Sequence, residues 1–251
     1  MNFLLLVVAL GLAGASPLPD SKVCQPHSKP WQVYIHGGHP SCSGALINKW
    51  WIVTSFNCPT IPYSSLASLG EHDVTVEEGT EQHIQVAEVI RHSPYRSPAH
   101  SLAMVRLAEP ARLNHNVKTI PLPTRCTQPG ETCYVSGWGS TVPNQYEPDQ
   151  HLKCITVPVV DDQTCMNTLP EYIYWSHGMV CAGQNNSDNC LNDDGSVMVC
   201  DGQLQGVQWM GLGCSNPSVY TKLCLYNNWI REVMDNYAPP LTTQMPPSMT
   251  T

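Results

Sequence analysis

Twelve cysteines are the feature that most limits what this chain of 251 residues can fold into. Their number is even, and no two of them are three positions apart, which argues against a zinc site or a redox motif. Residues 2–12 are almost continuously apolar and run into Ala13-Gly14-Ala15, a pattern typical of a secretory signal peptide. We therefore expect residues 1–15 to be removed and the cysteines of a secreted, extracellular protein to form disulfides.

The charge of the chain limits its partners. Lys and Arg number 12 and Asp and Glu number 20, so the formal net charge is −8 at pH 7. Such a balance disfavours binding to nucleic acid or to an anionic membrane surface. Beyond residue 15 no apolar run is long enough to cross a bilayer. We expect neither nucleic acid nor a membrane as a partner, and we expect a monomer.

Short β-rich segments recur between glycine, proline and serine residues, which is typical of an all-β sandwich or barrel. Near the end of the chain, apolar residues from Trp229 to Tyr237 repeat at helical spacing and predict one helix. Residues 238–251 are rich in Pro, Thr, Met and Ser and predict a disordered tail. The clearest strand segments are residues 31–35, 45–47, 51–54, 84–90, 103–107 and 155–160.

Two cysteines bracket a polar turn, Cys190-Leu-Asn-Asp-Asp-Gly-Ser-Val-Met-Val-Cys200. This run resembles, without gaps, the nucleophile loop of the trypsin-like serine proteases, Cys-Gln-Gly-Asp-Ser-Gly-Gly-Pro-Val-Val-Cys. Further segments are similar to motifs of the same family and extend the resemblance over residues 24–237. They are Pro30–Val33, Cys42–Ile47, Trp51–Thr54, Ser136–Gly139, Val219–Lys222 and Asn228–Ile230.

The resemblance implies an all-β fold of two six-stranded antiparallel β-barrels with a C-terminal helix. The domain would span residues 24–237, after a short N-terminal segment of residues 16–23. Spacing alone leaves the cysteine connectivity open, but all twelve cysteines fall at positions of the family. The implied disulfides are Cys24–Cys154, Cys42–Cys58, Cys126–Cys224, Cys133–Cys200, Cys165–Cys181 and Cys190–Cys214.

The family cleaves peptides with a serine nucleophile, a histidine base and an aspartate that orients the histidine. At the matching positions this chain has Asp194, Asn57 and Ser101. An amide cannot act as a general base near pH 7, and a carboxylate is a poor nucleophile that repels a developing oxyanion. The oxyanion-hole glycine is Asn192, and the backbone of Asp194 holds the second position. We therefore expect no catalytic residue and an inactive protease homologue.

Other residues offer no replacement for this triad. His100 adjoins Ser101, but neighbouring residues of a strand point to opposite sides. His72 lies in another loop, and Ser196 is two positions too late to act as the nucleophile. Asp193 and Asp194 are neighbours in one turn and cannot face each other across a substrate.

The activation signal of the family is also missing. Trypsin-like enzymes begin, after cleavage, with an Ile-Val-Gly-Gly sequence whose amine pairs with the aspartate before the nucleophile. No such sequence precedes Cys24, and cleavage after Lys22 would leave an amine too close to Cys24 to reach Asp193. A buried carboxylate without a partner is costly. We therefore expect the loop of residues 189–196 to be either solvated or rearranged as in a zymogen.

The substrate pocket of the family is only partly retained. Asp188 matches the aspartate that binds Lys or Arg side chains in trypsin, and Gly211 matches a glycine of the pocket wall. Ser218 replaces the second glycine and narrows the pocket. Asp188 is either a cation-binding residue or a remnant on a solvated loop. Asn185 begins an Asn-Asn-Ser glycosylation signal beside the pocket.

Residues 71–81 resemble the trypsin calcium loop. The resemblance implies that the side chains of Glu71, Glu78 and Glu81 and the carbonyl groups of Asp73 and Val76 surround the ion. Carboxylate and carbonyl oxygens suit Ca²⁺. We expect a structural Ca²⁺ here, although an acidic exposed loop is the alternative.

Two classes of function follow from these observations. The first is a non-catalytic binding protein. The cleft that holds the substrate in the protease family would here hold a protein or peptide with an exposed basic side chain, or a protease inhibitor. The alternative is a serine-type endopeptidase with residual trypsin-like specificity for Lys and Arg. A third possibility is a secreted, calcium-stabilised scaffold protein whose cleft has no function. The three triad substitutions favour the first class.

Overall fold

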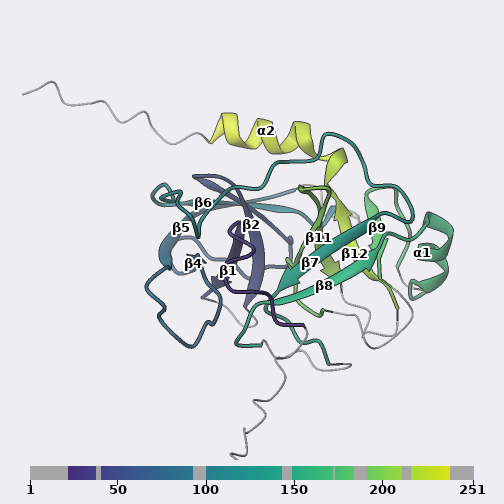
Figure 1. Ribbon diagram of the computed structural model, residues 1–251. Coiled ribbons are helices and arrows are strands. Elements are labelled where there is room, and N and C mark those ends of the chain that lie inside the picture. The colour runs from purple at the N-terminus through teal and green to yellow at the C-terminus, as the bar shows by residue number, and fades with distance from the viewer. Residues whose placement is uncertain are drawn as a thin grey trace, which may run out of the picture.

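Two six-stranded antiparallel sheets form the protein (Figure 1), in a computed structural model that describes residues 22–37, 41–92, 100–142, 149–171, 173–183, 191–210 and 216–237. The first sheet closes into a barrel in the order β1-β2-β3-β6-β5-β4, and the second has the order β8-β7-β10-β11-β12-β9. The predicted fold class is confirmed. The strands are β1 (Gln32–His36), β2 (Cys42–Asn48), β3 (Trp51–Thr54), β4 (Leu66–Leu69), β5 (Gln82–Arg91), β6 (Ala103–Leu107), β7 (Thr132–Gly137), β8 (Lys153–Pro158), β9 (Met179–Ala182), β10 (Val197–Cys200), β11 (Gln203–Met210) and β12 (Ser218–Lys222).

The alternation of side chains explains the first barrel. Ala67 and Leu69 of β4 and Ile84 and Val86 of β5 are buried in one apolar cluster inside the barrel. Successive side chains of a strand point to opposite faces, so the residues between them lie on the outside. Ser68 of β4 is one of these, and it pairs directly with a residue of the neighbouring strand.

A second apolar cluster joins the two halves of the chain. Strands β3 and β6 contribute Val53 and Met104 to it, and strands β10 and β11 contribute Val197 and Val207. This packing holds the ends of β3, β6 and β10 in one fixed arrangement. In the sequence, Asn57 follows β3, Ser101 precedes β6, and Asp194 precedes β10.

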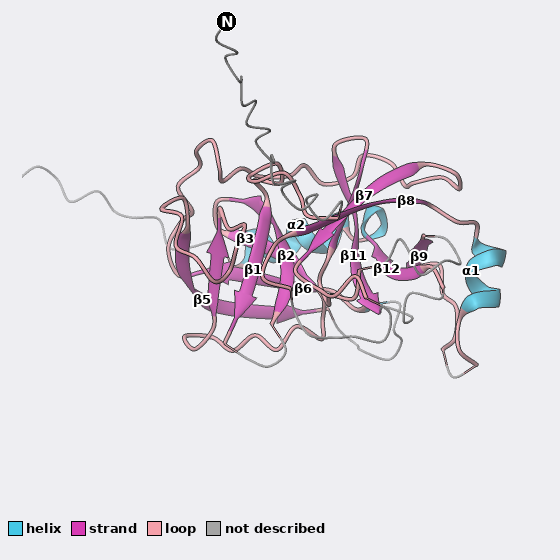
Figure 2. Cartoon of the chain, turned by 60° about the horizontal axis from the view of Figure 1, so that its bottom comes forward, coloured by secondary structure: helices cyan, strands magenta, loops and turns pink. Residues whose placement is uncertain are grey.

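Two α-helices and a 3-10 helix accompany the sheets in the part of the chain that the structure describes (Figure 2). The helix α2 (Asn227–Asn236) packs Ile230 and Val233 against the cluster between the halves, as the helical spacing predicted. Tyr237 departs from that prediction, because it follows the helix and is exposed. The helix α1 (Asp162–Thr168) lies beside β9 at the far end of the second sheet, and the 3-10 helix η2 (Leu223–Leu225) precedes α2. Within the described ranges no helix is long and apolar enough to cross a membrane.

Five of the six expected disulfides are present in the structure. They join residues as far as 130 positions apart, which removes conformational freedom from the unfolded chain. The sixth expected pair, Cys190–Cys214, lies outside the described residues, as do the signal peptide and the tail of residues 238–251. The five pairs are Cys24–Cys154, Cys42–Cys58, Cys126–Cys224, Cys133–Cys200 and Cys165–Cys181.

Candidate functional site

The degenerate nucleophile loop packs closely against the end of β7. A Cβ atom on Gly137 would lie 2.1 Å from Asp193 Oδ2 and 2.2 Å from Ser196 Oγ. Gly195 has a φ of +86°, and a Cβ there would meet the carbonyl oxygen of Ser43 at 1.9 Å. Both positions therefore require glycine. The close packing of the loop therefore explains why Gly137 and Gly195 are glycine, without any catalytic role for them.

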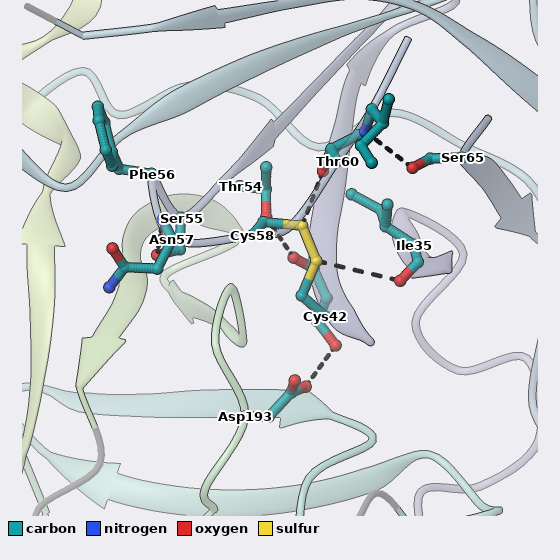
Figure 3. Close-up of a disulfide and its surroundings, with 12 residues drawn as sticks. Ile35, Cys42, Thr54, Ser55, Phe56, Asn57, Cys58, Thr60, Ser65 and Asp193 are labelled. Carbon is teal, nitrogen blue, oxygen red and sulfur yellow. Dashed lines mark hydrogen bonds between the residues drawn. A yellow bond between two sulfur atoms is a disulfide. The ribbon is translucent and has the colours of Figure 1, made fainter. Parts of the chain in front are cut away.

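Three donors from the described residues hold Asp193. Its Oδ2 atom accepts hydrogen bonds from the hydroxyl of Ser43, from the hydroxyl of Ser196 at 3.1 Å and from the backbone N–H of Trp138 at 2.9 Å. Figure 3 shows the Asp193 carboxylate directed toward the strand that begins at Cys42. Burial raises the pKa of Asp193 to about 7, although the three donors oppose this shift.

These contacts bear on the two expectations for the loop. Asp193 is partly buried and has partners, because the chain itself supplies two hydroxyl groups and an N–H group. Ser196 is fully buried and bonded to Asp193, so its hydroxyl is not presented as a nucleophile. Sequence reasoning missed Ser43, which lies 150 positions from Asp193.

Asp194 is the residue that the sequence resemblance matches to the nucleophile. Burial raises the pKa of its carboxyl group to about 6. Its carbonyl oxygen accepts a hydrogen bond from the N–H of Ser43 at 3.0 Å, which fixes the backbone of the loop to β2. The side chain is therefore a partly buried acid at the point where the family places a serine hydroxyl.

Asn57 and Ser101 are the residues that the resemblance matches to the other two triad positions. Asn57 is exposed, and its backbone N–H donates to Ser55 Oγ at 3.2 Å. In Figure 3 its amide points away from the Cys42–Cys58 disulfide. Ser101 is fully buried, its hydroxyl lies 3.3 Å from Ser55 Oγ, and its carbonyl oxygen accepts from Thr221 Oγ1 at 2.9 Å. Neither residue provides a base or the charge that orients one.

Asn192, which the sequence resemblance matches to the oxyanion-hole glycine, has its backbone N–H engaged within the chain. The N–H of Asn192 donates to the carbonyl oxygen of Ser140 at 2.9 Å. The Asn192 side chain is only 8% exposed. An N–H that already donates to a carbonyl cannot stabilise a developing oxyanion. The sequence identified Asn192 as a departure from glycine, but it contained no signal for this hydrogen bond.

The two histidines considered as substitutes have other contacts. His100 Nδ1 lies 2.8 Å from the hydroxyl of Tyr226, and the His100 ring stacks on His92 with ring centroids 5.1 Å apart. The His72 ring lies between two other histidine rings, and burial lowers the pKa of His72. Each imidazole is therefore packed in its own cluster, outside the loop of Asp193 and Asp194.

The specificity pocket is described only in part. Ser218 opens strand β12, where it pairs with Ala182 of β9 and is 8% exposed. The other pocket residues, Asp188 and Gly211, lie outside the described residues, as does the glycosylation signal at Asn185.

The expected calcium loop is assembled in part. Glu71 is 8% exposed, and its Oε1 atom and the Oε2 atom of Glu81 are buried without a hydrogen-bond partner. Burial, together with the charge of Glu81, raises the pKa of Glu71 to about 7. The other oxygen of Glu81, Oε1, accepts from the backbone N–H of Glu78 at 2.8 Å. Two neighbouring carboxylates that repel each other, each with one oxygen that lacks a partner, are what a bound cation would satisfy.

The remaining expected ligands are arranged differently. A carboxylate oxygen of Glu78 lies 3.9 Å from His27 Nε2, and the carbonyl oxygen of Asp73 accepts a hydrogen bond from the N–H of Val76 at 3.0 Å. Over the described ranges, no three Asp, Glu, His or Cys side chains gather closely enough to hold a metal ion. Glu71 and Glu81 thus fit a cation, and Glu78 would have to turn from His27 to join them.

Known proteins are similar to this chain along most of its length. The family model described as Trypsin matches residues 19–230. A trypsin of Xenopus laevis is 39% identical over 246 residues, which covers 93% of this chain and 99% of that protein. Cationic trypsin-3 of Rattus norvegicus is 38% identical over 250 residues, with the same coverage. Among solved structures, mouse neuropsin, a serine protease, is 34% identical with a TM-score of 0.75 and covers 85% of this chain and 98% of its own.

Proposed function

Because this chain belongs to the trypsin family of serine proteases, we propose that it is a secreted pseudoprotease, which uses the family fold for binding and cleaves no peptide bond. The observation that carries the proposal is the set of side chains at the three triad positions, Asn57, Ser101 and Asp194. The family mechanism needs a hydroxyl nucleophile, a base and an orienting acid, and this chain has none of the three at these positions.

The geometry around these residues supports the proposal further. Attack by the Asp194 carboxylate on an amide would place a second negative charge beside the developing oxyanion. The N–H of Asn192, which would stabilise that charge, donates to Ser140 instead. The loss therefore extends from the nucleophile and the base to the electrostatic stabilisation of the transition state.

The same contacts suit a binding role. In trypsins the loop becomes ordered when a new N-terminal amine pairs with the aspartate, whereas here Ser43, Ser196 and Trp138 hold Asp193 from within the chain. A loop whose aspartate is held by contacts within the chain is preorganised for a partner. The net charge of −8 favours a basic one, and Asp188 is at the position that receives a basic side chain.

Calorimetric titration with a Kunitz-type inhibitor that presents a lysine tests this function. We expect a complex whose affinity falls at least tenfold in Asp188→Asn, while mass spectrometry finds the inhibitor uncut after prolonged incubation. An inhibitor cut at its reactive bond would support a serine-type endopeptidase with residual trypsin-like specificity. If no binding is measured, only the third possibility remains, a secreted scaffold protein whose cleft has no function.

We further propose that the loop of residues 71–81 binds a structural Ca²⁺. The unpartnered oxygens of Glu71 and Glu81 support this site, and the carbonyl groups of Asp73 and Val76 would complete it. Glu78 would join after turning from His27. A cation held by the folded state alone stabilises that state by mass action.

Calcium should therefore raise the melting temperature. At free Ca²⁺ about a hundredfold above the dissociation constant, the gain is roughly 2.7 kcal/mol, or a few degrees for a domain of this size. Scanning calorimetry in millimolar Ca²⁺ and in chelator measures it. The double variant Glu71→Gln, Glu81→Gln should lose the response, and Glu109→Gln, an exposed acid elsewhere, should keep it. Identical curves for the unaltered protein in both buffers would show only an acidic surface loop.

A further inference from the structure

Two histidines outside the calcium loop and the loop of Asp193 pack against the start of the C-terminal helix. His92 follows β5, and His100 precedes β6. Their rings stack with centroids 5.1 Å apart and with planes 22° from parallel. The backbone N–H of His92 donates to the carbonyl oxygen of Leu102 at 2.9 Å, so the two strand ends that carry the histidines are held together.

Two aromatic side chains enclose His92 from other sides. The ring of Tyr226, which directly precedes α2, lies edge-on to the His92 ring with centroids 5.3 Å apart. The ring of Trp229, in the first turn of α2, lies at 4.9 Å. The Tyr226 hydroxyl also lies 2.8 Å from His100 Nδ1. Both histidines therefore belong to the contact that attaches the start of α2 to the first barrel.

The surroundings of His92 are poorly suited to a charged ring. Its Nδ1 atom is buried and has no hydrogen-bond partner among the described residues. In the charged form both ring nitrogens carry a hydrogen, so Nδ1–H would be a buried donor without an acceptor. Such a donor costs the free energy of removing it from water. Charged His100, by contrast, can donate from Nδ1 to the hydroxyl of Tyr226.

The groups that face His92 do not offset this cost. Burial, and then the charge of His100, lowers the pKa of His92. Burial also raises the pKa of Tyr226 to about 12, so its hydroxyl stays neutral. The neighbouring Arg91 donates to the backbone carbonyl groups of residues 56 and 58. The charged residues of α2 are exposed, and they are Arg231, Glu232 and Asp235.

From this geometry we propose that His92 and His100 form an acid-sensitive latch between the first barrel and α2. At neutral pH the two uncharged rings stack, and Tyr226 and Trp229 pack against them. In acid both rings gain a proton, which places two like charges about 5.1 Å apart at the stacked rings. Their repulsion and the unpartnered donor of His92 then loosen the start of α2.

Acid weakens this contact because the pKa of His92 is lowered in the folded state. The folded protein binds this proton less tightly than the unfolded chain does. The contribution of His92 to stability is therefore complete above the ordinary pKa of 6.5 and is lost as the pH falls through the lowered value. Asp193, whose pKa is raised, acts with the opposite sign and does so equally in variants of His92.

Histidine titration by NMR and hydrogen exchange of the α2 amides test the latch. We expect His92 to titrate below 6.5. Between pH 7.5 and pH 5, exchange at residues 230–233, divided by the intrinsic rate at each pH, should become at least about threefold faster. His92→Phe keeps a ring that cannot be charged, so it should abolish this increase. His115→Phe, at an exposed histidine, should preserve it.

Three results would overturn the latch. The first is a folded-state His92 that titrates at or above 6.5, which is measured on the unaltered protein and so does not depend on the folding of any variant. The second is exchange in α2 that does not become faster in acid. The third is an equal increase in His92→Phe and in the unaltered protein, which would place the acid-sensitive group elsewhere.

Discussion

Restoring the family triad in the triple variant Asn57→His, Ser101→Asp, Asp194→Ser is expected to give a peptidase that is still about 10²–10³-fold slower than a trypsin assayed beside it. The reason is the Asn192 N–H, which donates to Ser140 and not to the oxyanion. Loss of one such donor costs about 10²–10³ in kcat. Each single substitution should give no measurable rate, since the triad residues act as a unit.

The measurement is kcat/KM on an arginyl chromogenic substrate. Adding Asn192→Gly to the triple variant is the informative comparison, because glycine can turn its N–H toward the substrate more readily. The rate of the Asp194→Ala variant, which lacks the carboxylate and gains no hydroxyl, is the inactive control. A triple variant as fast as trypsin would show that the hydrogen bond from Asn192 to Ser140 does not limit the oxyanion hole.

Acidification from pH 8 to pH 5 is expected to stabilise the fold through Asp193. Its pKa is raised by burial from 3.8 to about 7, so the folded state binds this proton more tightly than the unfolded chain does. Between about pH 4 and pH 7 the folded protein therefore carries more protons, and the free energy of unfolding falls as the pH rises. At about 1.4 kcal/mol per unit of pKa shift, the contribution between pH 5 and pH 8 is on the order of 3 kcal/mol.

Urea unfolding at both pH values, in the presence of chelator, measures this effect. Other groups titrate in the same range, so the comparison is with Asp193→Asn, whose amide stays neutral and keeps an oxygen that can accept from Ser43. The unaltered protein should lose about 3 kcal/mol more than the variant between pH 5 and pH 8. If both proteins lose the same free energy of unfolding between pH 5 and pH 8, Asp193 is already ionised at pH 5 in the folded state. The conclusion that burial raises its pKa would then be wrong.

The sequence predicted those parts of the fold that depend on local pattern or on matching motifs. The strand expected at residues 84–90 is β5 (Gln82–Arg91), and the helix expected from Trp229 is α2 (Asn227–Asn236). The five observed disulfides agree with the pairing that the resemblance implied, which no spacing argument could have supplied. The short strand β4 (Leu66–Leu69) is not among the segments that the sequence pattern predicted.

Contacts between distant segments were beyond sequence reasoning. The contact between Asp193 and Ser43 depends on how β2 passes the loop before β10, and the sequence held no signal for it. The assignment of Asn57, Ser101 and Asp194 to the triad positions stays a prediction from the sequence, whereas the hydrogen bonds of these residues and their neighbours required the three-dimensional structure.

Hydrolysis of arginyl and lysyl chromogenic peptides by the unaltered protein, with and without enteropeptidase treatment, tests the central claim most directly. With Asn57, Ser101 and Asp194 at the triad positions, the rate should equal that of a buffer control in both cases. Turnover well above that control, blocked by a serine-directed phosphonate and absent from Asp194→Ala, would contradict the account.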